Sequence, residues 1–192
     1  SGKYHNDMNT RDTLITDLNV LANFNPVVPA GYKDAKILML GNLHPSVQMS
    51  VISQVHNPKL IILDTMNFWM DCALTELMQV IAKVNVITIN DEEARQLSGE
   101  YSLVLAAQKI MEMGPEFVVI KKGEHGALLF HKDNIFSAPA LPLAKVFDPT
   151  GAGDTFAGGF TGYLSKTGDF SYENMKAAIV YGSVLASFCV EK

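Results

Sequence analysis

The chain alternates short apolar segments with longer stretches that have helical periodicity. Leu60–Leu63 is wholly apolar, and Val84–Ile89 is nearly so. Strands of this kind are buried on both faces, which is typical of a parallel sheet covered by helices. The alternation therefore predicts an α/β fold, a three-layer αβα sandwich with a mostly parallel central sheet.

Periodicity and turn residues give approximate positions for the elements. We expect strands at residues 12–24, 36–40, 59–64, 84–89, 117–121, 127–130 and 134–138. We expect helices after Ser46 (as N-cap), from residue 74, from Asn90, near residues 103–110, from Asp154 to about Ser165, and from Tyr172 onward. Residues 65–71 are expected to form a loop.

Composition limits the class of protein. The 192 residues are 48% hydrophobic and 18% charged, as in an ordinary globular domain. A net charge of −5 and the lack of a basic tail argue against nucleic acid as a partner. No apolar run is long enough to span a membrane. Cys72 and Cys189 are expected to be buried thiols of a reducing, cytoplasmic compartment.

The stretch Val146–Phe160 predicts a loop that runs into a helix. Gly151 and Gly153 would let a phosphate approach backbone N–H groups at the helix N-terminus, where the helix dipole also favours an anion. Asp154 would stand beside that anion, where a carboxylate can accept a proton from an attacking hydroxyl. The alternative is a plain turn in which Asp154 only favours the helix start.

Two other glycine-loop motifs do not fit this spacing. A P-loop needs a Lys after its second Gly, which is absent here. A dinucleotide fingerprint needs a third Gly where this chain has Phe156, and it opens a βαβ unit early in a domain.

The string Asp148–Phe160 closely resembles the C-terminal signature of the ribokinase (PfkB) family of carbohydrate kinases. The resemblance implies an ATP-dependent small-molecule kinase with Asp154 as catalytic base. It implies an anion hole formed by Gly151, Ala152 and Gly153. It also implies that Asp148 and Thr150 belong to a site for a monovalent cation such as K⁺.

Asn90 and Glu93 have two interpretations. The pair has the spacing of a capping box at a helix start. The family carries an Asn-x-x-Glu motif here, so the resemblance implies that the two residues organise Mg²⁺ and its waters near the phosphates.

The segment from Lys121 to Gly126 follows a predicted strand and turns into the next one. The resemblance implies that Lys121, Gly123 and Gly126 line the nucleotide site, although family members often have Thr at the position of Lys121. We expect Asn90, Gly123 and Gly151 to follow strands directly and to meet at the carboxyl edge of the sheet.

Full members of the family are longer, so the fold is expected to be incomplete, lacking N-terminal and C-terminal parts. Residues 31–192 would form the nucleotide-binding core, and residues 1–30 a remnant of the lid region and linker, through which a homodimer could form. We expect phosphoryl transfer from ATP to an alcohol of a small carbohydrate, with little activity in this chain alone. A nucleoside kinase and a non-catalytic nucleotide-binding fragment are the alternatives.

Overall fold

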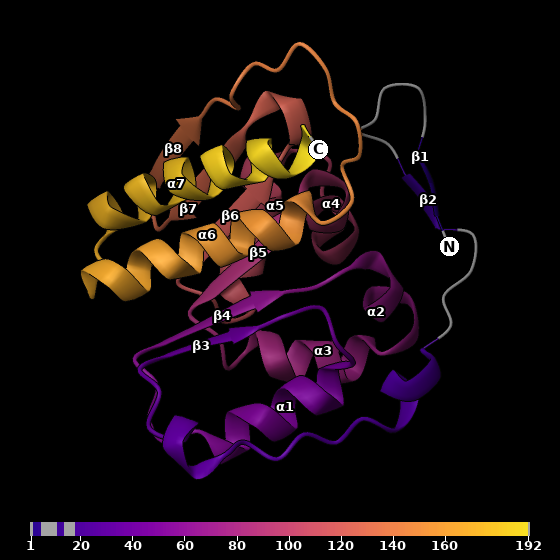
Figure 1. Cartoon of the computed structure of the whole chain (residues 1–192), viewed down its shortest axis with the longest axis vertical. Coiled ribbons are helices and arrows are strands. Elements are labelled where there is room, and N and C mark those ends of the chain that lie inside the picture. Colours follow the sequence, from indigo (N-terminus) through magenta and orange to yellow (C-terminus); the bar gives the residue numbers. More distant parts are fainter. Residues whose placement is uncertain (1, 5–10, 14–17, 192) are drawn as a thin grey trace.

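The computed structural model describes residues 2–4, 11–13 and 18–191, and its main feature is a six-stranded sheet (Figure 1). The strands are neighbours in chain order, and the first four run parallel whereas the last two pairings are antiparallel. The strands are β3 (Ile37–Leu40), β4 (Leu60–Asp64), β5 (Val86–Asn90), β6 (Phe117–Lys121), β7 (Ala127–His131) and β8 (Asn134–Ala138). The predicted α/β fold is confirmed.

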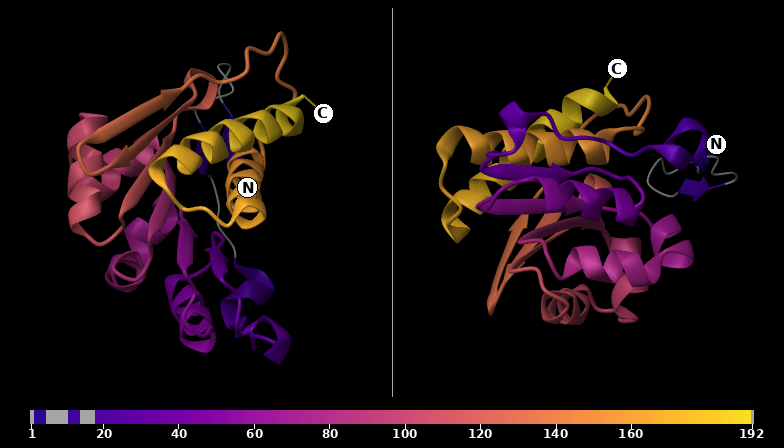
Figure 2. Two further views of the ribbon diagram at one scale, coloured as in Figure 1. Left: turned by 90° about the vertical axis from the view of Figure 1, so that its left-hand side faces the viewer. Right: turned by 90° about the horizontal axis from the view of Figure 1, so that it is seen from below.

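Helices cover both faces of this sheet, as Figures 1 and 2 show. One face carries α1 (Pro45–Gln54), α2 (Asn67–Cys72), α3 (Leu74–Ile81), α4 (Asp91–Ser98) and α5 (Leu103–Glu112). The other face carries α6 (Ala152–Thr167) and α7 (Tyr172–Val190), which lie side by side. The helices and sheet therefore make three layers. None of the described helices is long and apolar enough to cross a membrane.

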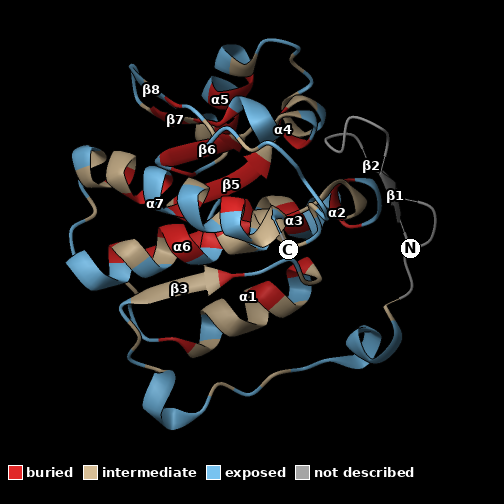
Figure 3. Cartoon of the chain, turned by 45° about the horizontal axis from the view of Figure 1, so that its top comes forward, coloured by how far each residue is buried: buried red, intermediate tan, exposed pale blue. Residues whose placement is uncertain are grey.

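The apolar strands bury side chains on both faces, because successive residues of a strand point to opposite sides. In β4, Ile61 and Leu63 join the core under α1–α5, whereas Leu60 and Ile62 join the core under α6 and α7. Figure 3 shows the buried strands between partly exposed helices. Their carboxyl ends consequently form a fixed edge on which polar side chains can be placed.

The expectation of a strand at residues 12–24 was wrong over its second half. Asn19–Asn23 is a 3-10 helix (η1), and Ala30–Tyr32 forms a second one (η2). Gly2–Tyr4 (β1) pairs with Arg11–Thr13 (β2) in a small antiparallel sheet, and residues 14–17 lie outside the described part. Leu18 and Val20 have the alternating pattern of a strand. The chain nevertheless turns at Leu18, whose carbonyl accepts the Leu21 N–H.

Other local expectations were also wrong. Part of the expected loop at residues 65–71 is helical, since α2 begins at Asn67. His44, not Ser46, is the N-cap of α1, because the His44 Nδ1 accepts the Ser46 N–H at 3.1 Å. Cys72 is exposed and Cys189 is partly exposed, so neither is a buried thiol.

Candidate active site

Three polar side chains end three neighbouring strands. Asp64, Asn90 and Lys121 are the last residues of β4, β5 and β6. Asn90 lies opposite Lys121 in the parallel register, and Asp64 lies opposite Thr88. The carboxyl edge of an open α/β sheet is where such proteins bind ligands.

Asp64 and Lys121 form an ion pair across this edge. The Lys121 Nζ donates to Asp64 Oδ1 at 2.9 Å, and the buried Thr88 hydroxyl donates to the same oxygen at 2.9 Å. The Lys121 side chain is 18% exposed and the Asp64 side chain 7%. Sequence reasoning missed Asp64, although a carboxylate that ends a wholly apolar strand was a signal for it.

The N-terminus of α6 presents unpaired donors. Gly151 precedes the helix with φ +82°, a left-handed conformation that favours glycine, and the helix start has no side-chain cap. The N–H groups of Gly151, Gly153 and Asp154 have no acceptor among the described residues. The Ala152 N–H differs, because it donates to the Pro149 carbonyl at 3.1 Å. The expected anion hole therefore has donors at Gly151, Gly153 and Asp154, while the Ala152 N–H is already used.

Lys121 connects the strand ends with this helix start. A Cβ atom placed on Gly153 would lie 3.2 Å from the Lys121 Nζ. The ammonium group is thus in contact range of the first turn of α6, where Asp154 is the acidic residue and is exposed. The structure brings together a cation, unpaired N–H groups and a carboxylate.

Asn90 and Glu93 form the predicted capping box at the start of α4. The Asn90 Oδ1 accepts the Glu93 N–H at 2.8 Å, and the Glu93 Oε2 accepts the Asn90 N–H at 2.8 Å. Burial raises the pKa of Glu93 to about 7, partly offset by the hydrogen bond from Asn90 and by the charge of Lys121. The nearby Asp64 and Glu92 carboxylates raise the same pKa.

This donor set fits Mg²⁺ held largely through water. Among the described residues, no group of three or more His, Cys, Asp or Glu side chains could hold a metal ion. Glu93 nevertheless keeps its Oε1 outside the capping box, and the Asp64 carboxylate is close enough to affect the pKa of Glu93. Mg²⁺ usually takes one or two carboxylates, several waters and phosphate oxygens, so few protein ligands suffice.

Asp148 and Thr150 form a turn just before α6. The Asp148 Oδ1 accepts the Thr150 N–H at 2.8 Å, and the Thr150 carbonyl accepts the Cys189 thiol at 3.7 Å. Hydrogen bonding from the Thr150 hydroxyl, and then from its N–H, holds the pKa of Asp148 below its usual value. The Asp148 carboxylate and Thr150 carbonyl are oxygens of the kind that bind a monovalent cation.

Gly123 and Gly126 lie in the turn between β6 and β7. Gly123 begins a 3-10 turn, and the Lys122 N–H donates to the Gly126 carbonyl at 2.7 Å. A Cβ on Gly126 would lie 2.0 Å from the Ala138 carbonyl oxygen, so packing alone requires glycine there. Gly151 does not follow a strand directly as expected, because residues 139–150 separate it from β8.

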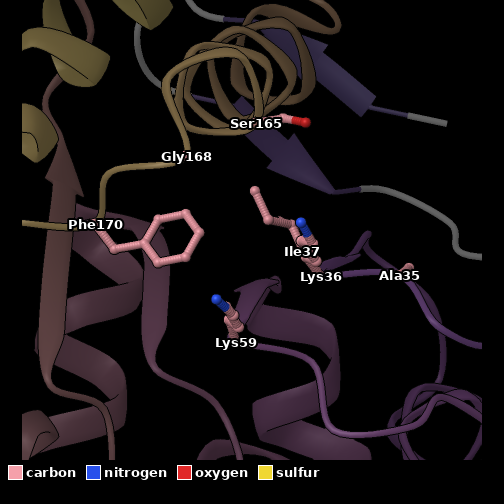
Figure 4. A pocket seen from close by; sticks show the side chains of 7 residues that line it. All are labelled: Ala35, Lys36, Ile37, Lys59, Ser165, Gly168 and Phe170. Atoms are coloured by element: carbon pink, nitrogen blue, oxygen red, sulfur yellow. The ribbon is translucent and has the colours of Figure 1, made fainter.

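A hollow at the opposite edge of the sheet has a different character. It lies beside the amino ends of β3 and β4 and the last turn of α6 (Figure 4). Lys36, Lys59, Ser165 and Phe170 are among its lining residues. It has neither the carboxylates nor the helix start described above, so the carboxyl edge remains the candidate site.

The fold and this edge define an α/β protein in which an uncapped helix start lies next to a lysine and acidic side chains. The family model described as pfkB family carbohydrate kinase matches residues 3–192. The chain therefore belongs to the pfkB family of carbohydrate kinases.

Relatives and solved structures agree with this family. The chain is 30% identical over 144 residues to a cytidine kinase from Thermococcus kodakarensis, covering 72% of this chain and 51% of that protein. It is 26% identical over 201 residues to an adenosine kinase from Saccharomyces cerevisiae, covering 94% and 58% of the two chains. The structure superposes on Methanocaldococcus jannaschii nucleoside kinase with a TM-score of 0.72 and 19% identity, covering 100% of this chain and 60% of that one. The chain spans about half the length of these relatives.

Proposed function

We propose that this chain carries the nucleotide-binding part of an ATP-dependent kinase that phosphorylates an alcohol group of a small carbohydrate. The observation that carries the proposal is the position of Lys121 against the first turn of α6, next to unpaired N–H groups. A cation and a helix N-terminus together attract phosphate. Asp154, in the same turn, supplies a group that can accept a proton.

In the proposed mechanism, Asp154 accepts the proton of the acceptor hydroxyl as this oxygen attacks the terminal phosphorus. The N–H groups of Gly151, Gly153 and Asp154 and the Lys121 ammonium stabilise negative charge on the transferring phosphoryl oxygens. Such positioning and charge stabilisation account for most of the acceleration in phosphoryl transfer. ADP leaves with the negative charge of the broken bond.

Asn90 and Glu93 would hold Mg²⁺ through water, and the ion would neutralise charge on the nucleotide phosphates. The ionised form of Glu93 suits this role, and its pKa of about 7 leaves the carboxyl only partly ionised at neutral pH. Asp148 and the Thr150 carbonyl would contribute to a monovalent-cation site such as one for K⁺. Lys121, Gly123 and Gly126 would border the nucleotide.

A nucleoside is the second candidate for the acceptor. Relatives named cytidine kinase, nucleoside kinase and adenosine kinase support it, whereas relatives named ribokinase support a sugar. Residues 31–192 would be the nucleotide-binding core, and residues 1–30 would belong to a lid and linker that could also mediate a homodimer. We place the enzyme in the cytoplasm, as is expected for a kinase that uses ATP.

An ADP-release assay tests the proposal in the longest natural form of the protein. A panel of pentoses, hexoses and nucleosides should identify an acceptor that stimulates ADP release from Mg-ATP. Asp154→Asn should lower this rate by about 10²–10⁴-fold while nucleotide affinity changes little. Asp133→Asn, which alters an exposed turn residue between β7 and β8, is the matched control.

Two results would contradict the proposed chemistry. Near wild-type turnover by Asp154→Asn would exclude this residue as the base. Binding of Mg-ATP without turnover on any acceptor would favour the remaining alternative, a non-catalytic nucleotide-binding protein. We also propose that the 192-residue chain alone turns over little, and acceptor-dependent ADP release by this chain at the rate of a longer form would contradict that.

A further inference from the structure

We propose that Asp64 is a positioning residue that holds the Lys121 ammonium at the place where the terminal phosphate of ATP binds. This inference rests on the proposed function, because it assumes that nucleotide phosphates bind at the start of α6. It goes further by giving a task to Asp64, a residue outside every motif described above.

An ion pair and a close helix backbone limit the position of the ammonium group. Asp64 Oδ1 accepts from the Lys121 Nζ at 2.9 Å, and the place of a Gly153 Cβ lies 3.2 Å from the same nitrogen. Because a lysine has a flexible four-carbon stem, its charge stays in one place only where a partner holds it. Here the Asp64 carboxylate holds it by an ion pair, and the first turn of α6 lies close to it.

The carboxylate itself is firmly held. Asp64 is the last residue of the buried strand β4, and its Oδ1 also accepts from the Thr88 hydroxyl at 2.9 Å. Thr88 is fully buried in β5. A buried hydrogen bond to a charged group fixes geometry more strongly than an exposed ion pair does. The hydrogen bonds that Thr88 and Lys121 donate to Asp64 therefore connect the rigid sheet with the proposed phosphate position.

The contribution of the carboxylate's position can be separated from that of its charge. Asp64→Glu keeps the charge but adds one methylene, so the carboxylate and the ammonium must shift. Gly153→Ala keeps all charges and places a methyl group 3.2 Å from the Lys121 Nζ. Lys121→Met removes the cation, and Lys122→Met removes the same charge one residue further along as a control.

The measured quantity is the dissociation constant of Mg-ADP divided by that of Mg-ATP. Both are obtained by calorimetry on the longest natural form of the protein. General disturbance of the nucleotide site affects both nucleotides and cancels in this ratio. Loss of a held cation at the terminal phosphate weakens ATP more than ADP. Thermal unfolding of each variant checks that it is folded at the temperature of the titration.

We expect Lys121→Met to lower the ratio about 10-fold, and Asp64→Glu and Gly153→Ala about 3- to 10-fold. Lys122→Met should leave it within about twofold of the wild type. Because Asp64 acts through Lys121, the double variant Asp64→Glu/Lys121→Met should have the same ratio as Lys121→Met alone.

The inference is overturned if Asp64→Glu binds both nucleotides with the wild-type ratio. It is also overturned if Asp64→Glu lowers the ratio further in the Lys121→Met background, since Asp64 would then act independently of Lys121. Failure of the proposed function has a different signature. In that case the wild-type protein binds neither Mg-ATP nor Mg-ADP.

Discussion

Gly182 of α7 packs directly against the backbone of Phe156 in α6. A Cβ placed on Gly182 would lie 2.7 Å from the Phe156 carbonyl oxygen and 3.2 Å from its ring. Both residues are buried, and Phe156 follows Asp154 by two positions. The packing of α7 against α6 therefore helps to fix the helix that carries the proposed catalytic turn.

Gly182→Ala should destabilise the protein by about 1–3 kcal/mol, because the added methyl group overpacks a backbone contact. Gly158→Ala is the matched control, since its Cβ would meet nothing within 4 Å on an exposed position of α6. That variant should gain up to about 1 kcal/mol from helix propensity. Urea unfolding measures both. Equal stability of the two variants would argue against close α6–α7 packing at Gly182.

Thr88→Val should lower the free energy of unfolding by about 1–3 kcal/mol. The substitution keeps the shape of the side chain but removes the hydroxyl that donates to Asp64 at 2.9 Å. Among the described residues, the buried Asp64 carboxylate then keeps the Lys121 ammonium as its side-chain donor. Chemical denaturation of wild type and variant gives the difference. A neutral result would show that water replaces the lost donor.

Glu93 should make stability depend on pH. Its pKa is raised from 4.5 to about 7 on folding, so the folded state binds the proton more tightly. The stabilisation is fully present below pH 4.5 and is lost as pH rises through 7. The loss is on the order of 3 kcal/mol.

Glu93→Gln tests this pH dependence while preserving the capping box. Gln resembles the protonated Glu, so the variant should match the wild type near pH 5 and exceed it in stability near pH 8. Urea unfolding curves at both pH values provide the comparison. Parallel pH profiles for the two proteins would show that Glu93 does not titrate between them.

Mg²⁺ affinity should rise with pH through 7 in the wild type. The ion favours the ionised Glu93 carboxylate, and its binding releases a proton from a group whose pKa is about 7. Calorimetry of Mg²⁺ with bound ADP, in buffers of different ionisation enthalpy, counts the protons released. Glu93→Gln should bind Mg²⁺ more weakly and release no proton. An unchanged affinity would leave only the capping role for Glu93.

The local features of the site could be predicted from sequence because their residues are near neighbours. Asn90 and Glu93, the two ends of the capping box, are only three positions apart, and the turn before Asp154 contains Gly151 and Gly153. The Asp64–Lys121 contact could not be predicted, because 57 residues separate the partners and only the strand register brings them together.

Other errors came from weak or competing local signals. The helix α2 has no side-chain cap at Met66, so no sequence signal marked its start. His44 replaced the more usual Ser46 as N-cap by accepting a hydrogen bond through its imidazole ring. The apolar alternation at Leu18 and Val20 resembled a strand pattern, but the chain forms a 3-10 helix there. In each case tertiary contacts or an uncommon cap decided the conformation.

The uncapped start of α6 has a consequence for experiments in solution. Amide protons exchange with solvent deuterium quickly unless a hydrogen bond protects them, and the N–H groups of Gly151, Gly153 and Asp154 have no such bond within the described structure. An incoming anion would supply the missing acceptor. These amides should consequently be the fast-exchanging end of a stable helix, and slowing of their exchange would report binding at this helix residue by residue.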